Sequence, residues 1–136
     1  EKAFIIFLLQ GFSRNLRKEI SNSPRYFFWD NGIRNAIISN FNPLENRDDV
    51  GRLWENFCIA ERIKRQRYLE TFSDFYFWRT YDKQEIDLIE ITSGEISAFE
   101  FKWGDKESKA PKAFRENYTD ATYQTINKMN FYEFLT

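Results

Sequence analysis

The sequence predicts an α/β fold, a mixed β-sheet flanked by helices, with an N-terminal extension made of a β-hairpin and a short helix. Three observations predict it. A long segment from Asp48 to about Tyr68 has apolar residues at helical spacing, three strand-like segments follow it, and a helix, a strand and a final helix complete the chain. This order is typical of a sheet packed between helices.

The first part of the chain predicts short strands and one helix. Phe4–Leu9 and the stretch from Phe12 are expected to pair, because a glycine between them breaks the strand. A Ser-Pro pair ends a polar linker before the aromatic strand Tyr26–Trp29. Asp30 or Asn31 is the expected N-cap of a short helix, which an Asn-Pro pair closes.

The later elements alternate between helices and strands. The long helix has acidic residues at its start and basic residues at its end, as the helix macrodipole favours. Leu53, Trp54 and Phe57 belong to its apolar stripe. The expected bounds are Asp48–Tyr68 for this helix, Phe75–Tyr81, Glu85–Thr92 and Ile96–Trp103 for the three strands, Pro111–Tyr118 for the short helix, Thr122–Ile126 for the last strand and Met129–Leu135 for the final helix.

The length of 136 residues is that of one domain. Residues 1–45 are expected to belong to the same domain as a core formed by residues 46–136. The chain begins at Glu1 and its only methionine is Met129. We therefore interpret it as a fragment of a longer protein.

The residues that the chain lacks exclude several classes of site. Without histidine there is no Ser-His-Asp triad and no histidine-bound zinc. Cys58 is the single cysteine; it lies in an apolar helical stripe and is expected to be a buried small residue. Because one cysteine cannot form a disulfide framework, a reducing cytoplasm is the expected compartment. The sequence has no phosphate-binding glycine loop and no apolar run near eighteen residues. Neither an ATP site nor a membrane helix is therefore expected in this chain.

Charged residues are balanced in number but clustered along the chain. The chain has 20 basic and 21 acidic residues, a net charge of -1, which is not typical of a protein that coats nucleic acid. One basic cluster follows the third strand, and in it Lys106, Lys109 and Lys112 are candidate nucleic-acid contacts. The alternative is an ordinary solvated face.

An acidic residue on one strand and a Glu-x-Lys sequence on the next form the main candidate site. These residues are Asp87, Glu100 and Lys102. Because strand side chains alternate between faces, Glu100 and Lys102 are expected to share one face of their strand. Two carboxylates on neighbouring strands can hold a hard divalent cation and position a water beside it. The pattern is therefore what a metal-dependent phosphodiesterase needs.

Each of these residues also has a plainer explanation. Asp87 and Glu100 could be solvated strand residues, and Lys102 could pair with one of them for about 0–1 kcal/mol. Their order on adjacent strands, after the long helix, favours a site-like cluster over three independent surface charges. On the helix itself, Glu55 and Glu61 are both candidates for a further acidic residue.

The element order and these carboxylates resemble the PD-(D/E)xK phosphodiesterase superfamily, which has the restriction-endonuclease-like fold. That superfamily carries an Asp on the second core strand, Glu or Asp-x-Lys on the third, and often a Glu on the preceding helix. The matching residues here are Asp87, Glu100, Lys102 and Glu55. Ile86 stands where the motif has its proline, a departure that leaves the expected ligands in place.

A closer resemblance covers nearly the whole chain. Four segments are similar to the uncharacterised domain found C-terminal to an AAA-type ATPase module in many bacterial and archaeal proteins. They are Arg14–Lys18, Tyr26–Asn35, Leu53–Phe57 and Glu85–Asp87. In that family the phosphate loop lies upstream. The resemblance therefore implies that any ATP binding and ATPase activity belong to a preceding part of the polypeptide.

The resemblances imply one of two functions. In the first, a nuclease coupled to an ATPase, Asp87 and Glu100 bind Mg²⁺ or Mn²⁺ together with the Phe101 carbonyl. Lys102 then orients the attacking water or neutralises charge on the phosphate, and Glu55 holds the water shell of the metal. DNA is the expected substrate. In the second, the fold is catalytically inactive and binds nucleic acid or its own ATPase domain.

Overall fold

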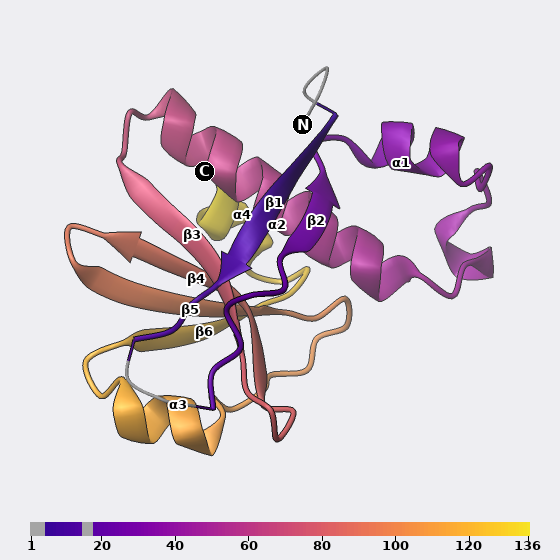
Figure 1. Cartoon of the computed structure of the whole chain (residues 1–136). Helices are drawn as coiled ribbons and strands as arrows, with labels where there is room; N and C mark the ends of the chain where they lie inside the picture. Colours follow the sequence, from indigo (N-terminus) through magenta and orange to yellow (C-terminus); the bar gives the residue numbers. More distant parts are fainter. Residues whose placement is uncertain (1–4, 15–17) are drawn as a thin grey trace.

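A six-stranded mixed sheet forms the centre of the protein (Figure 1). The computed structural model describes residues 5–14 and 18–136. The strands lie in the order β2-β1-β3-β4-β5-β6. They are β1 (Ile6–Gly11), β2 (Arg25–Phe28), β3 (Ser73–Arg79), β4 (Glu85–Thr92), β5 (Glu95–Phe101) and β6 (Thr122–Ile126), and the helices are α1 (Asn31–Ile37), the short 3₁₀ helix η2 (Leu44–Asn46), α2 (Val50–Tyr68), α3 (Lys112–Asn117) and α4 (Phe131–Leu135). The predicted fold class, an α/β fold with a mixed sheet flanked by helices, is confirmed.

The sheet combines antiparallel and parallel pairs. β3, β4 and β5 form an antiparallel meander, whereas β1 lies parallel to β3 and β6 lies parallel to β5. Parallel neighbours need a crossover connection. The connection from β1 to β3 contains α2, and the connection from β5 to β6 contains α3. The helices are therefore placed where the mixed sheet requires them.

Two apolar clusters cover the two faces of the sheet. On one face, Cys58 of α2 packs with Phe77 and Leu88 of the central strands, and α4 closes this cluster. On the other face, Phe114 of α3 lies edge-on to Trp78 with ring centroids 5.4 Å apart. Cys58 is fully buried, as expected, and burial raises the pKa of its thiol. A thiol in that position packs as a small apolar group.

The pairing predicted for the first strand is wrong. β1 pairs antiparallel with β2, not with the stretch from Phe12. Phe12 instead continues along β3 and donates its N–H to the Phe77 carbonyl at 2.8 Å. Gly11 does not make a hairpin turn: a Cβ there would lie 2.2 Å from the Ile20 carbonyl oxygen, so glycine is needed for the close passage of a later segment. Phe4, the expected start of the strand, lies outside the described residues.

Strand β5 is shorter than predicted. It ends at Phe101, so Lys102 follows the strand and does not share a strand face with Glu100 as expected. The reason is that β6, which pairs with β5, ends at Ile126 opposite Phe101. The Lys102 N–H donates to the Ile126 carbonyl at 2.9 Å. Lys102 is thereby held at the end of the sheet.

Residues 31–49, here called the α1 arm, extend away from the sheet (Figure 1). Asp30 caps α1 as predicted, because its Oδ1 accepts the N–H groups of Gly32 and Ile33 at 2.6 and 3.2 Å. The helix has no buried residue. Its position therefore depends on polar contacts made by the rest of the arm.

Those polar contacts converge on Asp49. Its carboxylate accepts hydrogen bonds from Arg47 at 2.8 Å and from Arg34 at 3.0 Å, and although Asp49 is the N-cap residue of α2, its side chain makes no capping hydrogen bond to that helix. The Arg47 side chain is only 2% exposed and also donates to the Asn40 carbonyl and to Asn35 Oδ1. The guanidinium groups of Arg34 and Arg47 thus fix the arm to Asp49, at the start of α2.

Acid is expected to weaken the α1 arm. The Arg47 guanidinium, and Arg34 with it, holds the pKa of Asp49 well below its usual range. A carboxylate with a lower pKa in the folded state contributes stability above its unfolded pKa of about 4 and loses that contribution as the pH falls. Urea unfolding at pH 7 and at pH 3 should therefore show a smaller loss of stability for Asp49→Asn than for the wild type. Equal losses would contradict this account.

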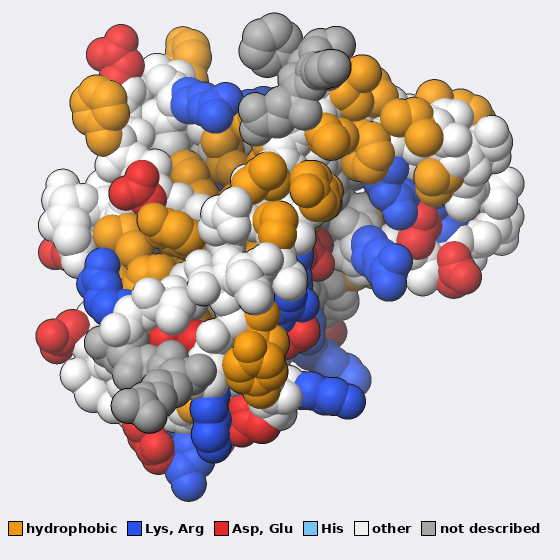
Figure 2. All heavy atoms as spheres, viewed as in Figure 1, with side chains coloured by type: hydrophobic (Ala, Val, Ile, Leu, Met, Phe, Trp, Pro, Cys, Tyr) orange, Lys and Arg blue, Asp and Glu red, His pale blue; other side chains and the backbone are white. Residues whose placement is uncertain are grey.

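Hydrophobic side chains gather over α1 and the adjoining part of β1 and β2 (Figure 2). Exposed members of this surface are Leu8, Tyr26, Ile33, Ile37, Ile38 and Phe41. Within residues 5–14 and 18–136, none of the helices combines the length and the apolar character needed to cross a membrane. The exposed apolar residues of this surface come from the α1 arm and from β1 and β2, the two strands at one edge of the sheet.

Candidate active site

The β4–β5 hairpin brings Asp87 and Glu100 together. Leu88 pairs with Phe99, which places Asp87 across from Glu100. The two carboxyl groups share a hydrogen bond, and Asp87 Oδ2 accepts the Phe101 N–H at 2.9 Å. The two acidic residues that the sequence singles out are therefore direct neighbours.

A β-bulge in β4 lies at Asp87. Ile86 pairs with Trp78 and Ile89 with Tyr76, so two residues of β4 stand opposite one residue of β3. A bulge turns side chains away from the regular alternation of a strand. Asp87 accordingly interacts with Glu100 on β5 and also with groups on α2. Alternation alone could not have predicted this position.

Glu55 of α2 faces Asp87 across the space beside the sheet. Burial is the main cause that raises its pKa, and repulsion by the Asp87 carboxylate adds to it. Arg25 of β2 lies 3.9 Å from the Glu55 carboxylate and partly offsets this effect. Glu61, the other helical candidate, instead pairs with Lys64 at 3.0 Å near the surface. The structure thus places Glu55, and not Glu61, beside the strand carboxylates.

Glu100 has the more strongly perturbed carboxyl group. Burial raises its pKa, and the hydrogen bond and charge of Asp87 raise it further, while Lys102 acts in the opposite direction. Lys102 itself is exposed at the end of β5. The interactions therefore follow a row from Glu55 through Asp87 to Glu100, with an ammonium group beyond the last member.

The row is not a closed cage of acidic ligands. Across the described part of the chain, no three Asp, Glu or Cys side chains are arranged to hold a metal ion by themselves. Asp87 and Glu100 are the close pair. A cation bound there would take its remaining ligands from main-chain carbonyls and water, as Mg²⁺ commonly does.

The lysine-bearing loop after β5 is attached close to this row. Ser108 donates its N–H to Thr125 Oγ1 at 3.0 Å, and its hydroxyl lies 2.8 Å from the Tyr123 hydroxyl. The charges of Glu100 and Asp87 contribute to raising the pKa of Tyr123, after burial. Ser108 thus fixes the loop to Tyr123, a residue whose pKa depends in part on the charges of Glu100 and Asp87.

The three candidate lysines differ in their surroundings. Lys106 and Lys109 are exposed on the loop, on either side of Ser108. Lys112 begins α3 and lies 3.9 Å from Glu116 one turn later. The two loop lysines are therefore exposed, whereas Lys112 pairs with Glu116 on α3.

A hollow of about 540 Å³ opens beside Glu55 and Asp87. Its charged lining residues are Arg25, Arg34, Arg52, Glu55, Glu85 and Asp87. Sequence reasoning did not single out the three arginines, which come from β2, α1 and α2. A local pattern could not have identified them, because only the pairing of β2 with β1 brings Arg25 near α2.

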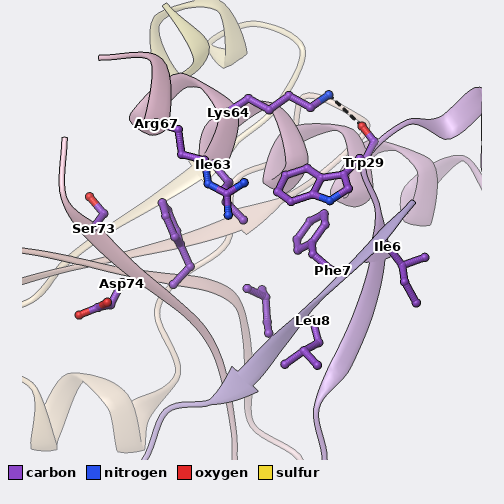
Figure 3. Close-up of a pocket in the computed structure, with 11 residues that line it drawn as sticks. Ile6, Phe7, Leu8, Trp29, Ile63, Lys64, Arg67, Ser73 and Asp74 are labelled. Atoms are coloured by element: carbon purple, nitrogen blue, oxygen red, sulfur yellow. Dashed lines mark hydrogen bonds between the residues drawn. The ribbon is translucent and has the colours of Figure 1, made fainter. Parts of the chain in front are cut away.

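A second hollow, of about 550 Å³, lies between β1, β3 and α2 and contains none of the predicted site residues (Figure 3). Phe7, Trp29 and Ile63 give it an apolar lining. Lys64 donates to the Trp29 carbonyl at 2.8 Å, and Arg67 lies over the Trp29 ring at 5.0 Å. Among the described residues that line this hollow, Asp74 is the one carboxylate, so we place the candidate active site at the carboxylate row.

Comparison with known proteins identifies the family. The model of the domain of unknown function DUF4143 matches residues 50–133, which include α2 and all of the carboxylate row. The uncharacterised proteins Mb2031c of Mycobacterium bovis and Rv2008c of Mycobacterium tuberculosis are each 28% identical over 102 residues, 74% of this chain. The chain spans 22% of the length of these relatives. No solved structure matches it significantly. The chain belongs to the DUF4143 family.

Proposed function

We propose that this domain is a Mg²⁺-dependent nuclease that hydrolyses phosphodiester bonds, with DNA as its substrate. The observation that supports the proposal most is the contact between Asp87 and Glu100 on adjacent strands, with Glu55 facing them and Lys102 beside them. Two close carboxylates next to an ammonium group suit a divalent cation and a phosphate better than they suit an apolar or uncharged ligand.

The donor set fits Mg²⁺ or Mn²⁺. Its atoms are carboxylate oxygens, the Phe101 carbonyl is the main-chain ligand that the resemblance implies, and the chain has no histidine that would favour zinc. Asp87 and Glu100 would hold the ion. When bound, a divalent cation polarises a phosphate oxygen and makes a bound water more acidic.

The remaining residues have distinct roles in the proposal. Lys102, exposed at the end of β5, is free to turn its ammonium group toward the phosphate and to balance charge that develops on it. Glu55 accepts hydrogen bonds from water on the α2 side of the row. Arg25 keeps Glu55 in place through their ion pair.

Metal titration tests this proposal directly. Calorimetry of the wild-type chain with Mn²⁺ and with Mg²⁺ should show one site, and Asp87→Asn or Glu100→Gln should weaken binding at least about 10-fold, because each removes a charged ligand. Asp74→Asn, which changes an exposed carboxylate on β3, is the matched control and should bind as the wild type. Equal binding by all four proteins would refute the assignment of the site.

A second candidate function is a nuclease-fold module that binds nucleic acid or its own ATPase domain without cleavage. Two observations favour it: no three acidic side chains in the described residues form a metal site, and the net charge is -1. DUF4143 domains are commonly found C-terminal to AAA-type ATPases. The wild type would then bind a partner but show no cleavage with either metal.

A further inference from the structure

Three guanidinium groups line the hollow beside the carboxylate row. Arg25 comes from β2, Arg34 from α1 and Arg52 from the first turn of α2. The three arginines come from three different elements, and only the folded chain brings them to one hollow. Glu55 and Asp87 line the same hollow. The hollow is therefore a continuation of the candidate active site.

Two of the three arginines are already neutralised. Arg25 lies 3.9 Å from Glu55 and 3.3 Å from Glu85. Arg34 lies 3.0 Å from Asp49 and helps to hold the α1 arm. Both guanidinium groups already pair with carboxylates of the protein, so neither is the first choice as a contact for an anionic ligand.

Arg52 differs from both. It is exposed, and within residues 5–14 and 18–136 it forms no ion pair within 4.0 Å. It precedes Glu55 by three residues on α2, which places both side chains on the same side of the helix. Its charge acts on Glu55. Arg52 thus lines the hollow beside Glu55 and makes no ion pair with another described residue.

Cations lie close to the carboxylates on two elements. Arg52 lines the hollow together with Glu55 and Asp87, and Lys102 directly follows β5, the strand that carries Glu100. A polyanion bound at the carboxylates therefore has a cation on α2 and another at the end of β5 within its reach. A guanidinium group is well suited to hold a phosphate there, because its planar fork donates two parallel hydrogen bonds.

We propose that the Arg52 hollow binds the phosphate backbone of the nucleic-acid strand that is to be cut, with Arg52 as its principal contact. This inference rests on the proposed nuclease function. In it, Arg52 fixes the strand on the α2 side of the row while Lys102 acts on the β5 side. Arg52 is a positioning residue, since it contacts a flanking phosphate and not the reacting one.

Oligonucleotide binding tests the assignment, with Arg67 as the internal control. Arg67 is an exposed arginine on the same helix, but it lies at the other hollow with its guanidinium over Trp29 (Figure 3). Fluorescence anisotropy of a labelled 20-nucleotide DNA, single- or double-stranded, would be measured in EDTA over a range of salt concentrations. Wild type, Arg52→Ala, Arg52→Lys and Arg67→Ala would be compared.

Arg52→Ala should weaken binding about 3- to 10-fold and reduce the slope of log affinity against log salt by about 0.7–0.9, the share of one phosphate contact. Arg52→Lys should keep the slope and lose only part of the affinity, because lysine retains the charge but not the fork. Arg67→Ala should bind as the wild type. Thermal melting checks that each variant is folded.

The outcomes separate this inference from the nuclease proposal. Unchanged binding by Arg52→Ala, equal losses in Arg52→Ala and Arg67→Ala, or no binding of DNA by the wild type would each overturn the role of Arg52. If the wild type cleaves DNA while Arg52→Ala cleaves and binds normally, the nuclease function stands and this inference fails. If binding depends on Arg52 but neither metal supports cleavage, the phosphate contact stands and the nuclease proposal fails.

Discussion

Asp87→Asn should reduce Mg²⁺- or Mn²⁺-dependent cleavage of DNA by at least about 100-fold while the domain stays folded. Asp87 is the central member of the carboxylate row: it shares a hydrogen bond with Glu100, interacts with Glu55 and accepts the Phe101 N–H at 2.9 Å. Asparagine keeps the size and one acceptor oxygen but removes the charge that a divalent cation requires. The measurement is the rate of cleavage of labelled DNA at saturating metal.

The other members of the row should behave as one unit with Asp87. Glu100→Gln and Lys102→Ala should each cause a loss of similar size, and combining either with Asp87→Asn should add little, because groups that act together are far from additive. Asp74→Asn is again the control. Cleavage that survives Asp87→Asn, with an unchanged dependence on metal, would disprove the catalytic assignment.

Arg62→Leu should lower the free energy of unfolding by about 3–5 kcal/mol, because it breaks a buried ion pair by removing one partner. Arg62 of α2 donates to Glu90 of β4 at 2.8 and 3.1 Å, and the Glu90 side chain is only 5% exposed. Removing the guanidinium leaves a buried carboxylate whose described polar partners are Gln66, at 3.0 Å, and Thr92, at 3.5 Å. Urea unfolding followed by tryptophan fluorescence measures the change.

A double variant shows whether the unpaired charge causes that loss. Arg62→Leu combined with Glu90→Leu should recover most of the stability, because an apolar pair replaces the ion pair without leaving a buried charge. Lys64→Leu, two residues along the helix, is the control: it removes the hydrogen bond to Trp29 and the solvated ion pair with Glu61 but leaves no buried charge, so it should cost no more than about 1 kcal/mol. A loss below about 1 kcal/mol for Arg62→Leu alone would show that Glu90 is solvated in solution.

Arg62 also shows why basic clusters are hard to interpret from sequence. The segment around it contains several cations and is equally compatible with a solvated face or with phosphate contacts. In the structure, Arg62 spans the layer between α2 and β4, Lys64 contacts the Trp29 carbonyl, and Arg67 lies over the Trp29 ring. Neighbouring residues of a helix point in different directions, so a run of like charges has no single environment.

From α2 onward, the sequence by itself determined the order and type of the elements. Helical spacing predicted α2, and the predicted bounds of β4 and β6 are those observed. Local capping chemistry likewise predicted that α1 begins at Asp30 or Asn31, and Asp30 is the N-cap observed. These features depend on residues close together in the chain, so their signals are visible without a fold. The pairing of Asp87 with Glu100 belongs to the same class, because one short turn joins their strands.

Only the tertiary structure decided which distant segments meet. β1 pairs with β2, and beyond this pairing the Ile20 carbonyl passes so close to Gly11 that a Cβ would not fit, a contact that no local pattern encodes. The bulge at Asp87 turns its side chain toward α2 as well as β5. Arg52 and Arg25 reach the same hollow from elements that are not adjacent in sequence. The physical reason is that periodicity and propensity act over a few residues, whereas strand pairing, close backbone approach and charge neutralisation depend on distances set by the whole packed chain.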